Sequence, residues 1–162
     1  MTVADFGAGI GHYTLEVAKH LRNEGHVYAI DIQHELLKRL RTEAHKRGYT
    51  NVEIVWGDIE KEGASKLADK HADFVIMSNL LFQLDAKEPP FAEAHRILKI
   101  DGRLVVIDWS ESPPAGGSRM GPVRKHIVEK KAARSFAEAA GFDFSREFAA
   151  GAHHYGLIFV KR

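Results

Sequence analysis

Short apolar runs alternate along the chain with segments whose apolar residues recur three or four positions apart. In residues 35–47, for example, Leu36, Leu37, Leu40 and Ala44 share one side of a helix, and basic residues occupy the other. Glycines and prolines separate the segments. The pattern predicts strands at residues 3–6, 27–31, 52–56, 72–78, 103–109, 142–148 and 155–161, helices at 13–22, 35–47, 89–99 and 130–140, and a weaker helix at 64–68.

This order of elements predicts an α/β fold. Five strand–helix units follow one another, and the last two strands form a hairpin. Parallel strands need crossover connections, which are right-handed, so the units predict a doubly wound, mainly parallel sheet with helices on both faces. The 162 residues suit a single domain spanning 1–162. In such sheets ligands bind at the carboxyl ends of the strands.

Composition narrows the choice of partners and compartment. The formal net charge is +1, from 23 basic and 22 acidic side chains, so no overall field attracts nucleic acid or an anionic membrane. Without cysteine there is no disulfide, thiolate zinc site or cysteine nucleophile, as is common in a reducing compartment. No apolar run is long enough for a membrane span. We therefore predict a cytoplasmic protein.

The strongest chemical signal is a glycine-rich turn between the first strand and the first helix. It runs from Asp5 through Phe6, Gly7, Ala8 and Gly9 to Gly11. Glycines let the backbone take positive φ and let a ligand approach without Cβ interference. A dinucleotide-binding turn has its third glycine three positions after the second, whereas here the spacing is two. The spacing disfavours pyrophosphate and hence a nicotinamide-dependent oxidoreductase.

Two carboxylates end the next two strands and converge on the same edge. Asp31 closes the second strand, where its oxygens can accept hydrogen bonds from both hydroxyls of a ribose. Asp58 follows Gly57 after the third strand and can accept from an adenine amino group, while Ile32 and Ile59 can enclose the ring. Three strand ends therefore predict one nucleoside site. The alternative for each carboxylate is an ordinary turn residue, and for Asp5 a cap of the following turn.

Together these segments resemble the class I S-adenosylmethionine-dependent methyltransferases. Residues 3–13 resemble their first motif, 27–33 the acidic motif, 57–59 the adenine motif, and 97–104 the run before the fifth strand. The resemblance is to the small-molecule and quinone-biosynthesis-type branch. It implies a Rossmann-like sheet of order 3-2-1-4-5-7-6 with strand 7 antiparallel, S-adenosyl-L-methionine as cofactor, S-adenosyl-L-homocysteine as product, and a small-molecule methyl acceptor.

The amino end departs from the resembled family, whose members carry helices that cover the cofactor. Here the first strand begins at once, so we expect either a truncated frame or a lid from the loop at 112–122, a homodimer or another partner. A cofactor-binding remnant that serves a partner is the rival that is not an enzyme. An RNA methyltransferase is a third reading, and it rests on Arg119, Arg124, Lys125, Lys130 and Lys131.

The acceptor side is predicted from the antiparallel seventh strand, which begins at the carboxyl edge of the sheet. That places His153 and His154 beside Asp108 and Trp109. We take His154 and Asp108 as candidates to accept a proton or orient the acceptor, and Trp109 and Phe82 as pocket walls. Asn79 ends the fourth strand and is assigned to the cofactor. Adjacent histidines point to opposite sides of a strand, so no metal site is predicted.

Overall fold

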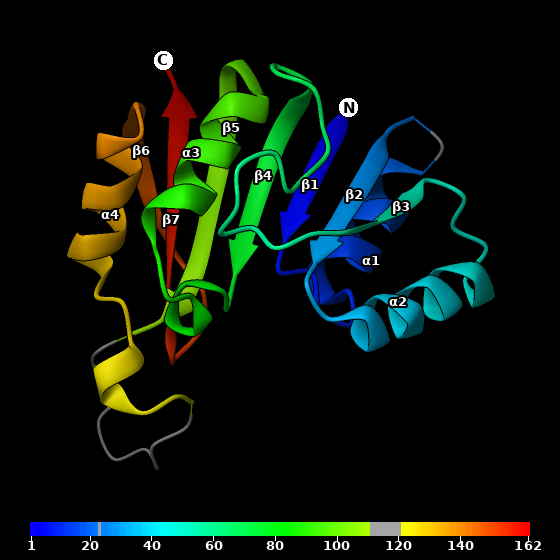
Figure 1. Cartoon of the computed structure of the whole chain (residues 1–162), viewed down its shortest axis with the longest axis horizontal. Coiled ribbons are helices and arrows are strands. Elements are labelled where there is room, and N and C mark those ends of the chain that lie inside the picture. The colour runs from blue at the N-terminus through cyan, green and yellow to red at the C-terminus, as the bar shows by residue number, and fades with distance from the viewer. Residues whose placement is uncertain (23, 111–120) are drawn as a thin grey trace.

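The computed structural model describes residues 1–22, 24–110 and 121–162, which form one seven-stranded sheet flanked by helices (Figure 1). The elements are β1 (Thr2–Phe6), α1 (His12–Leu21), β2 (His26–Asp31), α2 (His34–Lys46), β3 (Val52–Trp56), β4 (Ala72–Ser78), η1 (Leu81–Gln83), α3 (Glu88–Ile97), β5 (Leu98–Trp109), η2 (Arg124–His126), α4 (Lys130–Ala139), β6 (Phe142–Ala149) and β7 (His154–Lys161).

The strand order is β3-β2-β1-β4-β5-β7-β6, as predicted. β7 pairs antiparallel with both β5 and β6, and the other pairs are parallel. The carboxyl ends of β1 to β5 therefore lie at one edge, the lower edge in Figure 1, where β7 begins. Trp109 at the end of β5 is the register partner of His154 at the start of β7. The register brings the residues that the sequence assigned to the cofactor and to the acceptor to the same edge.

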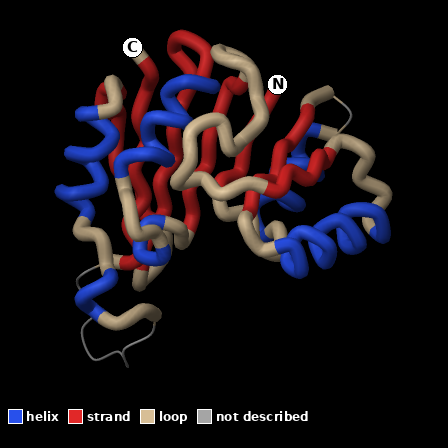
Figure 2. The backbone as a smooth tube through the Cα atoms, in the orientation of Figure 1, coloured by secondary structure: helices blue, strands red, loops and turns tan. Residues whose placement is uncertain are grey.

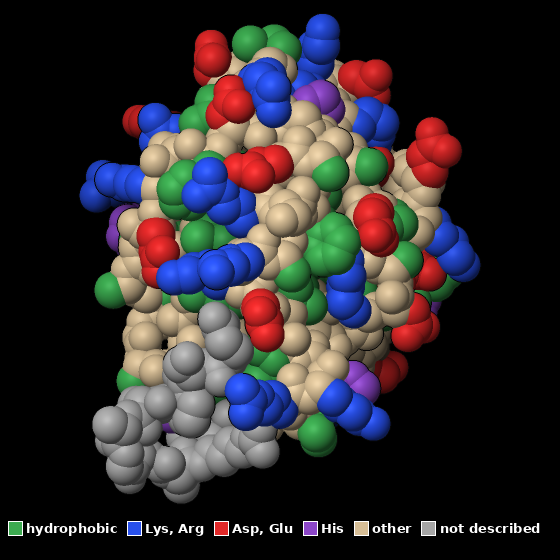
Figure 3. Space-filling view, turned by 90° about the vertical axis from the view of Figure 1, so that its left-hand side faces the viewer, with side chains coloured by type: hydrophobic (Ala, Val, Ile, Leu, Met, Phe, Trp, Pro, Cys, Tyr) green, Lys and Arg blue, Asp and Glu red, His purple; other side chains and the backbone are tan. Residues whose placement is uncertain are grey.

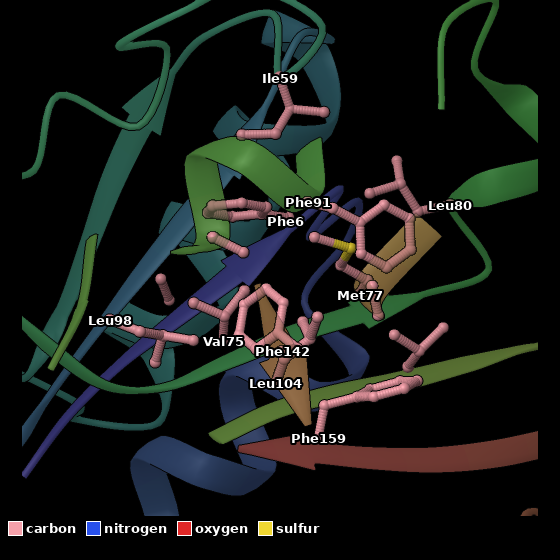
Figure 4. Packing of buried hydrophobic residues seen from close by; sticks show 14 of the residues in the cluster. Phe6, Ile59, Val75, Met77, Leu80, Phe91, Leu98, Leu104, Phe142 and Phe159 are labelled. Carbon is pink, nitrogen blue, oxygen red and sulfur yellow. The ribbon is translucent and has the colours of Figure 1, made fainter. Parts of the chain in front are cut away.

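Alternate residues of the central strands serve two separate layers. α1 and α2 cover one face of the sheet, and α3 and α4 cover the other (Figure 2). In β1, Ala4 and Phe6 join the large cluster beneath α3 and α4, which is shown with Phe91 in Figure 4. Val3 instead packs with Ala18 of α1. This two-residue alternation is what a strand buried on both faces requires.

Three local predictions need correction. β5 begins at Leu98, five positions before the expected 103, and Asp101 within it has φ 62°, so the expected turn survives as an irregularity inside the strand. Residues 64–68 form no helix: residues 64 and 65 belong to a turn, residues 66–68 are irregular, and Lys66 has φ 57°, which a right-handed helix does not allow. The short helices η1 and η2 were not predicted. Of the loop expected at 112–122, residues 112–120 lie outside the described residues.

Candidate active site

A cleft of about 250 Å³ opens at the carboxyl ends of β1, β2 and β3. It brings together seven residues that the sequence assigned to the cofactor: Gly7, Gly9, Asp31, Ile32, Gly57, Asp58 and Ile59. They come from three separate loops, so only the parallel sheet makes them neighbours. The residues predicted to bind a nucleoside therefore line one cleft.

The glycines of the first turn are required by both conformation and space. Gly7, Gly9 and Gly11 have φ of 72°, 55° and 90°, a region that side chains disfavour. A Cβ on Gly7 would lie 2.8 Å from Leu80 Cδ1, and one on Gly11 would overlap Leu40. A Cβ on Gly9 would meet nothing within 4 Å. Gly9 thus borders the open space that a ligand would occupy.

The amides of this turn already donate hydrogen bonds within the protein. Gly7 N and Ala8 N donate to the carbonyl of Ile30 at 2.8 and 3.1 Å, and Gly9 N donates to Asp31 Oδ2 at 2.8 Å. A phosphate cradle needs such amides to point at the ligand. These three amides are therefore not free to bind a pyrophosphate, which agrees with the glycine spacing.

Asp31 ties two strand ends together and still faces the cleft. Its Oδ1 accepts from Gln33 N at 2.8 Å, and its Oδ2 accepts from Gly9 N. The side chain is 7% exposed and lines the cleft. A carboxylate offers about four acceptor sites, so two amides leave room for two hydroxyl donors. The geometry suits a ribose.

The segments after β2 and β3 are held in place around the cleft. Trp56 Nε1 donates to the carbonyl of Ile32 at 2.9 Å, and the ring of Trp56 stacks on His34. Asp58 Oδ1 accepts from Glu60 N at 3.1 Å. Ile32 is 54% exposed and Ile59 is buried, yet both line the cleft. An apolar ring entering between them would cover the exposed isoleucine.

Asp5, Phe6 and Ala8 lie behind the cleft and do not line it. Asp5 Oδ2 accepts from Thr14 Oγ1 at 2.6 Å, which joins β1 to α1. Burial raises the pKa of Asp5 to about 6, against the lowering effect of Thr14, and the negative charge of Asp31 adds to the rise. The side chains of Phe6 and Ala8 belong to hydrophobic clusters. These residues shape the turn from behind.

Asp108 holds the chain that follows β4. Its Oδ2 accepts from Leu80 N at 3.1 Å and Leu81 N at 2.8 Å, and its Oδ1 accepts from Trp109 N at 2.8 Å. The side chain is 1% exposed, and burial raises its pKa despite these amides. The structure thus places the carboxylate against the backbone. Phe82, the other expected wall residue from this region, is half-buried in η1.

His154 and Asn79 meet at the same edge. His154 Nε2 lies 2.8 Å from Asn79 Oδ1, and the ring of His154 packs against Trp109 with ring centroids 4.3 Å apart. Burial lowers the pKa of His154, and neighbouring His153 adds to this effect. Asn79 was assigned to the cofactor, but its side chain faces the histidine. His154 also lines a second cavity, of about 500 Å³, together with residues of β6 and the start of α4.

Comparison with known proteins agrees with this geometry. A family model described as a methyltransferase domain matches residues 1–141. The chain belongs to the methyltransferase domain family. The chain is 27% identical to a SAM-dependent methyltransferase from Aquifex aeolicus of known structure, with a TM-score of 0.88 over 100% of this chain and 82% of that one.

Two curated relatives extend the comparison for this methyltransferase domain. It is 28% identical to an arsenite methyltransferase of Halobacterium salinarum over 70% of this chain and 28% of the relative. It is 32% identical to the ubiquinone/menaquinone biosynthesis C-methyltransferase UbiE of Azotobacter vinelandii over 67% and 42%. The chain thus spans less than half the length of these curated relatives. The [4+2]-cyclase SpnF shares the fold, with a TM-score of 0.81 at 18% identity.

Sequence reasoning missed several residues that build the site of this methyltransferase domain. Leu36 was expected to point inward with its neighbours, but it is half-buried and lines the cleft from the first turn of α2. Leu36 lies one position before the buried stripe of Leu37, Leu40 and Ala44, and this offset could have indicated that it faces another side of the helix. Leu80 fills the space over Gly7, and no local pattern reports that contact.

Glu93 of α3 was also missed; it does not line the cleft but holds a segment that does. Its carboxylate is buried and accepts from Ser65 N, Ser65 Oγ and Gly63 N at 3.1, 2.5 and 3.3 Å. Burial opposes its ionisation, but hydrogen bonds from Arg96 and Ser65 hold the pKa of Glu93 below its usual value. Glu93 thereby anchors the segment that carries Asp58 and Ile59.

The remaining expectations concern metal, RNA and membrane. Within residues 1–22, 24–110 and 121–162, no group of three or more His, Asp or Glu residues could hold a metal ion. Lys130 is paired with Glu147 at 2.8 Å, and Arg119 lies outside the described residues. Basic and acidic side chains are interspersed over the face that carries α4 (Figure 3). None of the described helices is long and apolar enough to cross a membrane.

Proposed function

We propose that this domain binds S-adenosylmethionine in the cleft at β1, β2 and β3 and transfers its methyl group to a small-molecule acceptor. The observation that carries the proposal is the arrangement of Gly9 and Asp31. The glycine presents open space, and the carboxylate beside it keeps free acceptor sites. This pair suits a neutral ribose and disfavours a phosphate, since the nearest charge is negative and the amides are already used.

The residues fit the parts of this cofactor in turn. Asp31 would accept from the ribose hydroxyls, Ile32 and Ile59 would enclose the adenine, and Asp58 would accept from its amino group. When bound, S-adenosylmethionine supplies an electrophilic methyl group on a sulfonium sulfur. The protein's own part is to position an acceptor in line with that group and to exclude water, which can provide most of the catalysis.

The relatives support methyl transfer but differ in what they act on. One is named for arsenite and the other for a carbon position in quinone biosynthesis. A fold shared with a cyclase shows that the fold alone does not decide the reaction. Support for the cofactor therefore comes from the cleft residues together with family membership, and support for the class of acceptor comes from the residues near His154.

Isothermal calorimetry with S-adenosylhomocysteine and NAD⁺ tests this proposal. We expect only S-adenosylhomocysteine to bind. Gly9→Val should abolish the binding, because the added methyl groups enter ligand space. Gly48→Val is the matched control, since Gly48 also has positive φ, 71°, and a Cβ there also meets nothing within 4 Å, but it ends α2 away from the cleft.

Both variants place valine at a positive φ with no side-chain clash inside the protein, so a difference in their affinity for S-adenosylhomocysteine would arise from the cleft. Unchanged affinity in a folded Gly9→Val protein would contradict the proposed site. Binding of NAD⁺ in preference to S-adenosylhomocysteine would contradict the proposed cofactor.

A further inference from the structure

The second cavity lies on the acceptor side and has firmly held walls. Lys130 of α4 binds Glu147 of β6 through both carboxylate oxygens, at 2.8 and 3.0 Å. Tyr155 donates its hydroxyl to the carbonyl of Val128 at 3.0 Å. Phe148 lies over Gly156, where even a Cβ would collide with the ring. These contacts fix a cavity of about 500 Å³ that opens beside His154.

Asn79 determines which nitrogen of His154 faces a ligand. The amide oxygen Oδ1 can only accept, so the Nε2 atom 2.8 Å away must carry the ring proton. Asn79 is itself held, because its N donates to the carbonyl of Ile107 at 2.9 Å and its carbonyl accepts from Gln83 Nε2 at 2.5 Å. The Nδ1 lone pair of His154 has no protein partner in the described part of the chain. His154 is thus a base with a defined free nitrogen.

His154 is linked to the proposed cofactor cleft through Asn79. Asn79 is followed directly by Leu80, whose side chain packs on Gly7 and lines the cleft. Asn79, which contacts His154, and Leu80, which lines the cleft, are consecutive residues and link the two hollows. Both hollows lie at the carboxyl edge of the sheet, where β5 ends and β7 begins.

We propose that the cavity of Lys130, Glu147, Phe148 and His154 binds the methyl acceptor, that the acceptor carries an acidic hydroxyl group of the phenol or enol type, and that His154 Nδ1 takes its proton. The proposal rests on the proposed function. In the overall reaction the acceptor gains the methyl group at oxygen or at the conjugated carbon. The bond from methyl to sulfur breaks with its electrons left on sulfur, and the proton lost by the acceptor ends on Nδ1.

The acidity of the acceptor follows from the base. Burial keeps His154 neutral near pH 7 but also makes it a weak base. Proton transfer is efficient when donor and base have similar pKa values, so an imidazole suits a phenol or enol better than an aliphatic alcohol. Asn79 acts as a positioning residue, because it touches the base and not the acceptor.

The tautomer can be measured without an acceptor. In ¹⁵N-resolved NMR of the whole protein, His154 should show the form protonated at Nε2, with a pKa below the ordinary value. Asn79 has φ 52°, which glycine adopts freely and aspartate tolerates. Asn79→Gly should therefore keep the fold and lose the tautomer preference, whereas Asn79→Asp should keep the tautomer and raise the pKa of His154. A wild-type ring protonated at Nδ1 would overturn the assignment.

The binding step uses 4-nitrocatechol as the probe, because its absorbance reports ionisation of its hydroxyl. With saturating S-adenosylhomocysteine, wild-type protein should bind the probe and shift it toward the phenolate form. His154→Gln should reduce this shift at least about tenfold, and the control His153→Gln should leave it within about twofold. Ala149→Phe, which fills the cavity, should block binding, whereas Ala152→Phe on the same hairpin should not.

Failure of this proposal and failure of the proposed function give different results. Calorimetry with S-adenosylhomocysteine should give the same affinity, within about twofold, for all four of these variants and the wild-type protein. If that affinity holds but the probe does not bind, or binds equally well to His154→Gln, the acceptor site is wrong. If S-adenosylhomocysteine does not bind the wild-type protein, the proposed function is wrong.

Discussion

Two carboxylates, Asp31 at the end of β2 and Asp108 near the end of β5, each hold a neighbouring loop by accepting hydrogen bonds from its backbone. Asp31 accepts a hydrogen bond from Gly9 in the loop that follows neighbouring β1. Asp108 accepts hydrogen bonds from Leu80 and Leu81 in the loop that follows neighbouring β4. In each case a side chain at one strand end holds the loop of the next strand. The same kind of carboxylate-to-loop contact therefore occurs twice at the carboxyl edge of the sheet.

The two carboxylates differ in how many hydrogen-bond acceptor sites remain free. Asp31 accepts two amides and borders the cleft, so acceptor sites remain for a ligand. Asp108 accepts hydrogen bonds from three amides, which leaves about one acceptor site, and its side chain is only 1% exposed, so that site is closed to a ligand. The comparison teaches that position in the strand does not distinguish a carboxylate with free acceptor sites from one whose oxygens are occupied. The number of internal donors does.

The largest effect is expected for Asp108→Ala. Three backbone amides would lose their acceptor, and each buried, unsatisfied group costs about 1 to 3 kcal/mol, so unfolding free energy should fall by about 3 kcal/mol or more. Chemical denaturation measures this change. Asp143→Ala is the control, since Asp143 is exposed and forms a surface ion pair with Arg162, and it should cost under about 1 kcal/mol. Equal, small losses of unfolding free energy in both variants would contradict the structural role of Asp108.

Asp5→Asn should have the next largest effect, and in the opposite direction at neutral pH. The pKa of Asp5 is about 6 in the folded protein and 3.8 ordinarily, so the folded state holds the proton more strongly. Stability should therefore fall by up to about 3 kcal/mol as pH rises from about 4 to about 6, the window between the two values. Asparagine keeps an oxygen for Thr14 without the charge.

Denaturation of both proteins between pH 4 and pH 8 checks this expectation. The difference in stability between Asp5→Asn and wild type should grow in favour of the variant through the window and then level off. A constant difference over the whole range would show that Asp5 is not protonated preferentially in the folded state.

Asp31→Ala sharpens the comparison on the binding side. It should weaken the binding of S-adenosylhomocysteine by about 1.5 to 3 kcal/mol, or roughly ten- to a hundredfold, because charge-assisted hydrogen bonds to the ribose are lost. It should cost less stability than Asp108→Ala, since it frees two amides, and not three, beside a cleft that water can enter. An unchanged dissociation constant in a folded variant would exclude Asp31 from the site.

The faces and directions of the strands could be predicted from local sequence patterns, whereas the strand order was implied by the family resemblance. Alternation within β1 and the tight connection from β6 to β7 specify faces and direction without any distant contact. The residues of the cleft that the sequence assigned to the cofactor were predictable for a related reason: each lies at the carboxyl end of a strand or within three residues after it. Parallel strands then bring Gly9, Asp31 and Asp58 to one edge.

The roles of single side chains could not be predicted in the same way. Asn79 faces His154, and Glu93 holds Ser65, because of tertiary register between elements far apart in the chain. Asp108 ends a strand as Asp31 does, and only the neighbouring backbone shows that its oxygens are occupied. The early start of β5 likewise depends on its pairing with β4, which includes a bulge between Ala72 and Phe74.

The central claim is that the cleft at β1, β2 and β3 holds the nucleoside of S-adenosylmethionine. A crystal structure of the protein with S-adenosylhomocysteine tests it most directly. The account predicts ribose hydroxyls within hydrogen-bond distance of Asp31, the adenine between Ile32 and Ile59, and the backbone of Gly9 in contact with the ligand. A ligand bound with its ribose away from Asp31, or outside the cleft altogether, would contradict it.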